Sequence, residues 1–456
     1  MQVLKNGGNA MKIIIVGASF AGMSAALECH QLYPEAQLVL IDKEKEVGFF
    51  PNALNWQLKG ELEHIEEARS ELWSQVQETM IDIRLETKLI QIDADHQLLR
   101  LEQGRNSIEE AYDVLILAMG AKQVWEIEDE KLQARMLSSK YFSDAQESQK
   151  KIEEASSVII IGGGQIGLES AEALSQLPLS IRIFEAEHSP LARYVDADLM
   201  VGIERELKKR RIALHTAEIV EKISLSSTGN KVRVDTLKGS YEADYLLFAT
   251  NFQPNTDLFR GILDCNPDKT LIVDEYLETS QPNIFAIGDL IQLPFAFFGK
   301  AYLPLINHAI LTGRLVAYNL VTKRRPLQEV QRMVSSHLFG YNITSVGLTE
   351  RQAQLWTDVD TVVLQTPFSQ WETEELTFKL IVQASDGRLL GGQLLSTSRY
   401  IHQMNTLSLA ISKGMTAQDM VEQSWLCLPR YTSLVPIVTE ACQLYLHRQE
   451  EKAYED

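Results

Sequence analysis

Two stretches of the chain carry the same order of apolar and polar positions. In the first, the apolar run IIIV at 13–16 leads through a glycine-containing turn into an Ala-rich segment, and a second apolar run ends at Asp42. In the second, the run VIII at 158–161 leads through three glycines into another Ala-rich segment, and the next apolar run ends at Glu185. A short buried run before a longer small-residue stretch predicts a strand and then a helix. Each stretch is therefore expected to form a strand–helix–strand unit.

A further repeat follows each of these units. The segments AYDVLILAMGA, which contains residues 113–120, and EADYLLFATNF, which contains residues 244–251, both indicate a buried strand that ends in a turn of small residues. Chains that alternate buried strands with helices form parallel sheets covered by helices on both faces. We therefore predict an α/β fold with two doubly wound, Rossmann-like dinucleotide-binding domains.

The last third of the chain has a different pattern. A helix is expected to open after Pro304, and the charged segment TKRRPLQEVQ at 322–331 interrupts the apolar pattern as a linker would. From about residue 326 the sequence alternates apolar and polar positions, as in LTFKLIVQA and GRLLGGQLLS, with helices expected near 403–413 and 432–447. This end of the chain is predicted to be a separate α+β domain.

The charge balance narrows the range of partners. The chain has 43 Lys and Arg against 62 Asp and Glu, a formal net charge of −19 at pH 7. This excess repels polyanions, so neither nucleic acid nor an anionic membrane is expected as the main partner. The uncharged stretch 13–27 is shorter than the about 20 residues of a membrane span. It is better explained by the first strand and helix than by a signal peptide.

Cysteine and histidine spacing indicates neither a disulfide framework nor a metal site. The four cysteines are far apart: Cys29, Cys265, Cys427 and Cys442. Free thiols are typical of a reducing cytoplasm, where we expect the protein to be found. The nine histidines show no metal-binding spacing. His308, His337 and His402 remain candidates for contacts with a cofactor or at a subunit interface.

The strongest single motif is Gly162-x-Gly164-x-x-Gly167, between the strand and the helix of the second unit. There the first glycine permits a tight turn, the second lets the backbone approach a pyrophosphate, and the third packs helix on strand. Glu185, about 20 residues further on, would accept hydrogen bonds from the adenosine ribose. The Glu185 carboxylate would repel the 2′-phosphate of NADPH by about 4 kcal/mol per pair of unit charges at 4 Å and an effective dielectric constant of about 20. NADH is therefore favoured over NADPH. The alternative is a purely structural glycine turn.

The first unit carries a weaker version of this motif, Gly17-x-Ser19-x-x-Gly22, with Asp42 as its acid. Serine replaces the middle glycine, but it is small enough to keep the backbone near a phosphate. A structural turn is the alternative here too. Two nucleotide-binding units in one chain suggest two different dinucleotides.

Three segments in order resemble the FAD/NAD-linked pyridine nucleotide-disulfide oxidoreductase superfamily: GASFAG near the N-terminus, GGGQIGLE in the middle and TSQPNIFAIGD up to residue 289. The chain is most similar to the family of NADH oxidases, NADH peroxidases and coenzyme A-disulfide reductases. This resemblance implies a discontinuous FAD-binding domain at 11–121 and 251–325, an NAD-binding domain at 122–250 and a C-terminal dimerisation domain at 326–456. It also implies a homodimer with FAD and NADH as cofactors.

The resemblance assigns residues to each cofactor. Asp42 would hold the FAD ribose and Asp289 a ribitol hydroxyl, although Asp289 could also be a helix cap or turn residue. The residues expected to bind FAD are Gly17, Ser19, Phe20, Ala21, Gly22, Asp42, Lys43, Asn52, Leu89, Ala118, Met119, Gly120, Gly288, Asp289, Pro304, Leu305 and His308. Those expected to bind NADH are Gly162, Gly164, Gln165, Ile166, Gly167, Glu185 and Asn251.

Three departures from the family pattern bear on the chemistry. In the segment GFFPNA at 48–53, Asn52 occupies the position of the redox cysteine. Phe20 stands where peroxidase members have a histidine, and Gln165 stands at the usual tyrosine. Because an amide cannot act as a nucleophile or form a sulfenic acid, these departures argue against disulfide and peroxide reduction.

Asn52, Glu169 and Tyr431 are the candidate catalytic residues. Glu169 would sit beside the nicotinamide; the alternative is a partly buried helix glutamate with a lysine partner. Tyr431 matches a family tyrosine in a segment that approaches the partner subunit's active site. Cys427 lies in the same segment, SWLCLPRYTS, and is expected to be a buried, inert thiol rather than a substitute for the missing cysteine.

These residues predict an FAD-dependent enzyme that takes hydride from NADH and passes electrons to a small-molecule acceptor that needs no protein thiol. Oxygen, a quinone or a small electron carrier would qualify, and oxygen is expected to yield hydrogen peroxide. One alternative is a coenzyme A-disulfide or persulfide reductase-like enzyme whose substrate brings the sulfur. Another is a degenerate flavoprotein that acts as a redox sensor, which NADH would fail to bleach in the absence of oxygen.

Overall fold

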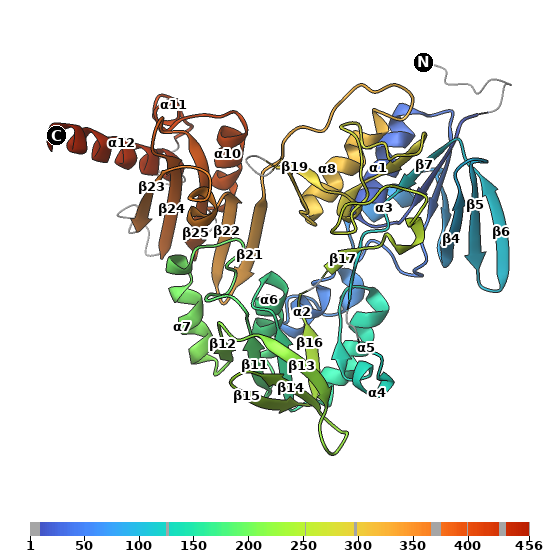
Figure 1. Cartoon of the computed structure of the whole chain (residues 1–456), viewed down its shortest axis with the longest axis horizontal. Coiled ribbons are helices and arrows are strands. Elements are labelled where there is room, and N and C mark those ends of the chain that lie inside the picture. Colours follow the sequence, from blue (N-terminus) through green and yellow to red (C-terminus); the bar gives the residue numbers. More distant parts are fainter. Residues whose placement is uncertain are drawn as a thin grey trace. The chain divides into compact units, whose positions relative to one another are not determined.

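The computed structural model describes residues 10–124, 127–250, 252–295, 299–365, 375–398, 400–427 and 435–455. The chain folds into two compact units, each built from separate stretches of sequence (Figure 1). Unit 1 combines residues 1–126, 139–149 and 251–329, and unit 2 combines residues 127–138, 150–250 and 330–456.

Unit 1 is built on a parallel sheet with the strand order β18-β7-β1-β2-β3. Ile14 in the central strand pairs with Val39 on one side and Leu115 on the other, and residues 13–16 are buried. A strand covered on both faces reads as a continuous apolar run, which is the pattern that predicted it. The strands are β1 (Lys12–Val16), β2 (Gln37–Ile41), β3 (Asp82–Arg84), β7 (Val114–Leu117) and β18 (Ile284–Ala286).

Helices and a smaller antiparallel sheet complete unit 1. The helices are α1 (Phe20–Leu32), α2 (Ala53–Leu58), α3 (Glu71–Gln77) and α8 (Ile306–Ala317), and α5 (Phe142–Glu153) begins in this unit. Helices α1 and α8 lie side by side (Figure 1). The antiparallel sheet consists of β4 (Thr87–Asp93), β5 (Leu98–Gln103) and β6 (Asn106–Ala111). Two short antiparallel pairs join β8 (Ala121–Gln123) to β17 (Phe252–Pro254) and β19 (Leu293–Phe295) to β20 (Gly299–Ala301).

The first half of unit 2 repeats the parallel arrangement, with the strand order β12-β11-β10-β16-β9. Its strands are β9 (Met136–Leu137), β10 (Ser157–Ile161), β11 (Ser180–Phe184), β12 (Ala213–His215) and β16 (Tyr245–Phe248). Its helices are α4 (Glu130–Gln133), α6 (Gln165–Leu174) and α7 (Val201–Lys209). An antiparallel meander of β13 (Val220–Leu225), β14 (Val232–Thr236) and β15 (Gly239–Ala243) lies beside them. Both predicted strand–helix–strand units are therefore confirmed.

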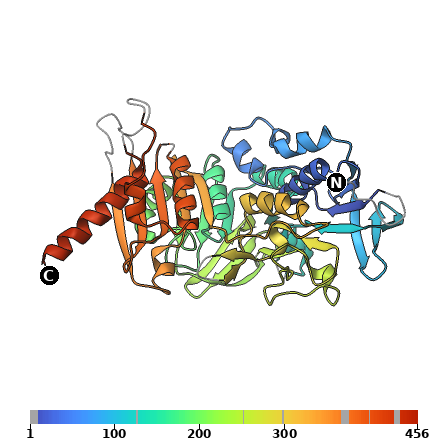
Figure 2. The same cartoon turned by 90° about the horizontal axis from the view of Figure 1, so that it is seen from above.

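The second half of unit 2 is an antiparallel sheet with the order β21-β22-β25-β24-β23, and helices α10 and α12 pack against it (Figures 1 and 2). The strands are β21 (Met333–Leu338), β22 (Tyr341–Gly347), β23 (Val359–Gln365), β24 (Leu376–Gln383) and β25 (Leu389–Ser396). The helices are α9 (Glu350–Ala353), α10 (Ile401–Ser412), α11 (Ala417–Val421) and α12 (Ile437–Glu455). The expected end of the last helix at 447 was too early, because α12 continues to Glu455.

The predicted fold class, two Rossmann-like units and a C-terminal α+β domain, is confirmed by this topology. Within the ranges that the structure describes, the helices are too short or too polar for a bilayer crossing. The domain limits expected from the sequence remain predictions.

Candidate functional site

The first glycine turn connects β1 to α1 and leaves no room for larger residues. Gly17 has a φ of +111°, and a Cβ on it would lie 2.2 Å from the Ala118 carbonyl oxygen. A Cβ on Gly22 would lie 1.7 Å from the Gly17 carbonyl oxygen. Ser19 precedes α1 and makes no side-chain capping hydrogen bond. The first amides of α1 are therefore not capped by that side chain, at a helix end that attracts negative charge.

Asp42 is held by the backbone around this turn. Its Oδ2 accepts a hydrogen bond from the Ala18 N–H at 2.6 Å, and its Oδ1 accepts one from Glu44 at 2.8 Å. Burial raises the pKa of the Asp42 carboxyl, and the two backbone N–H groups oppose that shift. The neighbouring Lys43 places its ammonium 4.6 Å from the centre of the Tyr141 ring.

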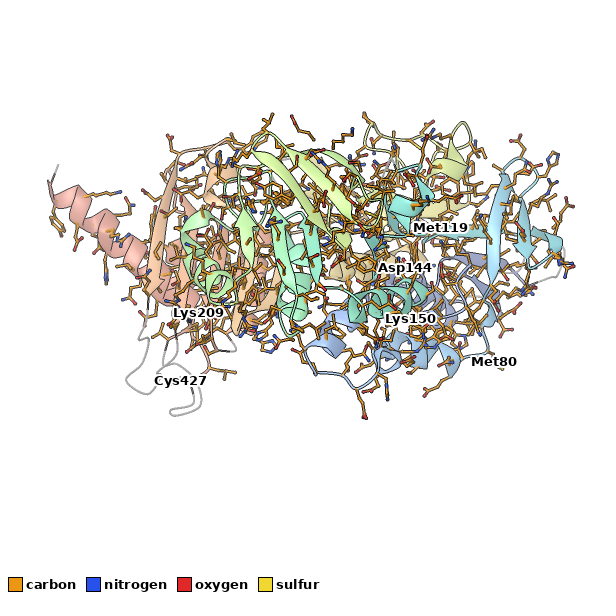
Figure 3. All side chains as sticks on the ribbon, turned by 90° about the horizontal axis from the view of Figure 1, so that it is seen from below. Met80, Met119, Asp144, Lys150, Lys209 and Cys427 are labelled. Atoms are coloured by element: carbon orange, nitrogen blue, oxygen red, sulfur yellow. The ribbon has the colours of Figure 1, made fainter. Side chains whose placement is uncertain are left out.

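The segment after β7 passes directly over the first turn. The Ala118 N–H donates to the Val16 carbonyl at 2.8 Å. Asn255, which sequence reasoning missed, clamps the next two residues. Its side chain donates to the Met119 carbonyl at 2.7 Å, and its N–H donates to the Gly120 carbonyl at 2.9 Å. Met119 is labelled in Figure 3.

A second acid, Asp289, lies at the end of β18. Gly288 has a φ of +65°, and a Cβ there would be 3.0 Å from the Ala21 Cβ. The Gly288 N–H donates to Thr312 Oγ1 at 3.0 Å, which ties this turn to α8. Burial raises the pKa of Asp289, and the positive charges of Lys140 and His308 oppose that rise.

Two residues near Asp289 were not predicted. Burial lowers the pKa of the Lys140 ammonium, although Asp289 opposes this shift, and Lys140 Nζ lies 5.4 Å from the centre of the Phe252 ring. The Tyr302 hydroxyl is buried and has no hydrogen-bond partner within the part of the chain that the structure describes. Burial and the Asp289 charge both raise the pKa of this phenol. A buried hydroxyl without a partner is a fitting contact for a polar ligand.

Helix α8 packs against the turn that holds Asp289. Leu305 precedes its first turn and Pro304 is exposed. His308 is buried, with Nδ1 3.2 Å from the Leu303 carbonyl oxygen. A Cβ on Gly313 would lie 2.3 Å from the Ala21 carbonyl, so α8 crosses α1 in backbone contact. The helix opening after Pro304 is confirmed.

Asn52 precedes α2 and is near in sequence to two members of an aromatic cluster, Phe50 and Trp56. Its Oδ1 accepts a hydrogen bond from Asn55 Nδ2 at 2.5 Å. The ring centre of Phe50 lies 5.3 Å from that of Phe20 and 5.6 Å from that of Trp56. Leu89, another expected contact, is buried on β4. The asparagine at position 52 cannot supply a thiolate.

The second glycine turn, between β10 and α6, has the same construction. Gly162 has a φ of +109°, and a Cβ on it would lie 2.3 Å from Thr250 Cγ2. A Cβ on Gly167 would lie 1.9 Å from the Gly162 carbonyl oxygen. A Cβ on Gly164 would meet nothing within 4 Å. That open side lies where a pyrophosphate would approach the backbone.

Glu185 ends β11 beside this turn. Its Oε2 accepts from the Gly163 N–H at 2.6 Å and its Oε1 accepts from the Glu187 N–H at 2.8 Å. On α6, Gln165 Nε2 lies 3.2 Å from Glu169 Oε1 and 3.2 Å from the Ser335 carbonyl oxygen. Glu169 therefore has a neutral amide partner on the same helix, and Ile166 beside it is exposed.

The remaining expected residues have different outcomes. Asn251 and Tyr431 lie outside the described residues. Cys427, labelled in Figure 3, is exposed rather than buried, so that prediction was wrong; its neighbour Leu426 is exposed as well. Cys29 is buried within α1, where burial raises the pKa of its thiol. Among the described residues, no cluster of three or more His, Cys, Asp and Glu side chains could hold a metal ion.

Comparisons with known proteins agree with this geometry. Residues 11–313 match the family described as pyridine nucleotide-disulphide oxidoreductase, and residues 334–435 match its dimerisation domain. An NADH oxidase from Enterococcus faecalis is 26% identical over 428 residues, which cover 92% of this chain and 96% of that protein. An NAD(P)H coenzyme A polysulfide/persulfide reductase from Pyrococcus horikoshii is 26% identical, covering 90% of this chain and 92% of that protein.

A solved structure shares the fold over nearly the whole chain. The water-forming NADH oxidase from Lactobacillus brevis, bound to NADH, has a TM-score of 0.90 and 25% identity and covers 97% of this chain and 100% of that one. The predicted resemblance and enzyme class are therefore confirmed. The protein is an oxidoreductase, and the chain belongs to the pyridine nucleotide-disulphide oxidoreductase family.

Proposed function

We propose that this protein oxidises NADH, bound at the second glycine turn, with FAD bound at the first, and passes the electrons to an acceptor that needs no protein thiol. The leading acceptor is oxygen. The balanced reaction is then NADH + H⁺ + O₂ → NAD⁺ + H₂O₂. FAD and NADH are the cofactors expected from the family, and the residues at both turns fit them.

The FAD assignment rests on the residues gathered in unit 1. Gly17 and Gly22 permit the tight turn between β1 and α1, and Ser19 leaves the first amides of α1 uncapped for a pyrophosphate. Asp42, held by the Ala18 N–H, is the acid that we assign to the adenosine ribose. Asp289 and the Tyr302 hydroxyl, which has no partner among the described residues, are buried polar groups that a ribitol chain would satisfy. FAD, when bound, supplies a two-electron centre that accepts a hydride and later returns the electrons. The protein's part is to orient both cofactors and exclude water from their reacting faces.

The NADH assignment rests on Gly164 and Glu185 in unit 2. The open side of Gly164 suits a pyrophosphate, and the Glu185 carboxylate suits ribose hydroxyls while repelling a 2′-phosphate. Glu185→Arg is expected to move the preference toward NADPH, because it replaces repulsion with attraction. Equal rates of flavin reduction by NADH and NADPH in the wild type would contradict this role.

Asn52 is the single observation that carries the choice of acceptor. In a cysteine-bearing oxidase of this family a thiolate reduces peroxide further, and an amide cannot do so. Asn52 also accepts a hydrogen bond from Asn55, and Phe50, two residues before it, packs against the rings of Phe20 and Trp56. Peroxide formed at this site would therefore be released.

Oxygen consumption with purified protein and NADH tests the proposal. About one peroxide per NADH is expected, and catalase should return about half of the oxygen consumed. Asn52→Cys should lower the peroxide yield, with Asn52→Ser as a matched control that restores no thiol. Water as the sole product of the wild type would refute the proposal. Negligible oxygen uptake together with rapid flavin bleaching would instead indicate a quinone or carrier as the acceptor.

Sulfur reduction is a second candidate function. Among relatives of similar identity is one named as an NAD(P)H coenzyme A polysulfide/persulfide reductase. With Asn52 at the cysteine position, the substrate would have to bring both sulfur atoms. NADH-dependent release of sulfide from coenzyme A persulfide, at a rate above that of oxygen uptake, would favour this function.

A homodimer and a cytoplasmic location complete the proposal. The match of residues 334–435 to a dimerisation domain supports the dimer, and the four free cysteines support a reducing compartment. Sedimentation at micromolar concentration should give a mass near twice that of the 51.5 kDa chain. A monomer would leave Tyr431 without a partner site and would argue against its catalytic role.

A further inference from the structure

A turn at residues 191–196 lies against the second glycine motif. The Leu191 N–H donates to the Gly163 carbonyl at 3.0 Å, and the Gly163 N–H donates to Glu185 at 2.6 Å. Leu191 itself is in the left-handed region with a φ of +55°, which a leucine adopts only when its surroundings impose it. Tyr194 and Val195 both donate to the Leu191 carbonyl and close the turn.

Asp196, the last residue of this turn, forms hydrogen bonds with residues in the C-terminal half of unit 2. Its N–H donates to Gln393 Oε1 at 2.8 Å, and its Oδ2 accepts from Gln393 Nε2 at 2.7 Å. The same oxygen accepts from the Glu350 N–H at 3.1 Å and lies 3.2 Å from Lys379 Nζ. Gln393 lies on β25, Lys379 on β24 and Glu350 at the start of α9.

Lys379 is the charge centre of this contact. Its side chain is only 4% exposed, and its ammonium lies 3.0 Å from Asp198 and 2.7 Å from Glu350 as well as near Asp196. Three carboxylates thus lie within 3.2 Å of one buried ammonium, and each contributes to holding it in place. Gln393 is fully buried and is fixed by its paired hydrogen bonds. The strained turn is therefore clamped by rigid strands rather than by solvent-exposed groups.

We infer that Gln393 and Lys379 are positioning residues for NADH: through Asp196 they hold the 191–196 turn against Gly163, and so set the affinity for the adenosine and pyrophosphate end of the dinucleotide. The inference rests on the proposed binding of NADH at the second glycine turn. It gives the C-terminal domain a role in cofactor affinity within a single chain, separate from any role in dimerisation.

The test compares two substrates with the holoenzyme of Gln393→Met. This variant keeps the side-chain volume but loses both hydrogen bonds to Asp196. The KM for NADH should rise about tenfold, while the limiting rate of flavin reduction stays within about twofold. Reduced nicotinamide mononucleotide, which lacks the adenosine half, should show no change in KM. Asp196→Asn is a milder second variant, in case Gln393→Met folds poorly, and should raise the KM for NADH in the same direction.

Glu375→Gln is the matched control. Glu375 accepts from the Tyr341 hydroxyl at 2.7 Å, and that hydroxyl accepts from Arg205 of α7 at 2.8 Å, so this contact also joins the two halves of unit 2. It does not touch the 191–196 turn, and its KM values should equal those of the wild type. An unchanged KM for NADH in both test variants would overturn the inference, as would an equal rise for both substrates. Wild-type flavin that NADH cannot reduce would overturn the proposed function itself.

Discussion

The two glycine turns hold their acids with the same pair of hydrogen bonds but with different side chains. In the first turn, Asp42 accepts from Ala18 at 2.6 Å and from Glu44 at 2.8 Å. In the second, Glu185 accepts from Gly163 at 2.6 Å and from Glu187 at 2.8 Å. The distances agree although one side chain is longer by a methylene group. The residue that follows the first glycine must therefore compensate for the difference.

The space around Gly163 shows how this compensation works. A Cβ there would lie 3.0 Å from Glu185 Oε2 and 3.1 Å from the Glu185 Cβ, closer than ordinary contact. Ala18 carries a Cβ at the equivalent position, beside the shorter Asp42. The acid and the residue after the first glycine are therefore matched as a pair. Such matching lets one backbone geometry serve two cofactors with different acids.

The surroundings of the two turns differ more than the turns themselves. Near the first, burial raises the pKa of both Asp42 and Asp289, with Lys140 and His308 opposing the rise at Asp289. Buried charges of this kind are costly in an empty site and favour a ligand that satisfies them. Near the second, Gly164 faces open space. This contrast suits a retained prosthetic group at the first turn and an exchanging substrate at the second.

The largest expected effect comes from the third glycine of each motif. In Gly22→Ala the new Cβ would lie 1.7 Å from the Gly17 carbonyl, and in Gly167→Ala it would lie 1.9 Å from the Gly162 carbonyl. Both contacts are with backbone, so the strand and helix must separate. Gly22→Ala should purify without flavin. Gly167→Ala should keep its flavin but lose at least about 100-fold in reduction by NADH, equivalent to about 2.7 kcal/mol.

Gly164→Ala is the control for steric strain, because its Cβ meets no protein atom within 4 Å. Its melting temperature should equal that of the wild type, and only the affinity for NADH should fall. Flavin content by absorbance and anaerobic titration with NADH measure both effects. A Gly22→Ala protein with a full complement of FAD would contradict the assignment of the first turn.

Asp289 should show an intermediate effect on FAD binding. Removing a charged hydrogen bond costs about 1.5–3 kcal/mol, so Asp289→Ala should weaken FAD retention roughly 10- to 150-fold. Asp289→Asn should also retain FAD less well, because a neutral amide accepts a weaker hydrogen bond than a carboxylate does.

The pH dependence of the apoprotein follows from the same carboxyl. Because the pKa of Asp289 is raised on folding, the folded chain binds its proton more tightly than the unfolded chain does. The free energy of unfolding therefore falls as the pH rises through the window from the ordinary pKa of 3.8 to the raised folded value, and stays low above it. The stability difference between wild type and Asp289→Asn should shrink as the pH falls through that window. A difference that does not change with pH would argue against a buried charge.

The sequence is informative where a feature is local. The strand–helix–strand units, both glycine motifs and their acids depend on short runs of residues, and the structure has them where they were expected. Asn255, Lys140 and Tyr302 were missed because they come from loops that only the tertiary fold brings to the first turn. Nothing in the spacing of a lysine before a helix indicates a carboxylate 149 positions further along the chain.

The hydrogen bonds between Gln393 and Asp196 were missed for the same reason, because 197 positions separate the two residues in the sequence. Exposure was also hard to predict. Cys427 stands between apolar neighbours in WLCLP and still lies at the surface. A short apolar run indicates burial only when another element covers it.

The smallest expected effect tests the matched pair directly. Gly163→Ala should crowd the Glu185 carboxylate, and Glu185→Asp should leave that carboxylate too short to reach the Gly163 N–H. Each change alone should weaken NADH binding by about 1 kcal/mol, roughly fivefold. The double variant recreates the pairing of Ala18 with Asp42 and should bind NADH within about twofold of the wild type, so the two changes should not be additive.

Ala18→Gly is the control in the first turn, where it removes no hydrogen bond and should leave FAD retention unchanged. Anaerobic titration at fixed salt gives the dissociation constant for NADH of the wild type, the two single variants and the double variant. Flavin absorbance gives the FAD retention of Ala18→Gly. If the double variant is weaker than either single variant, the two positions are independent and the shared geometry of the two turns has another cause.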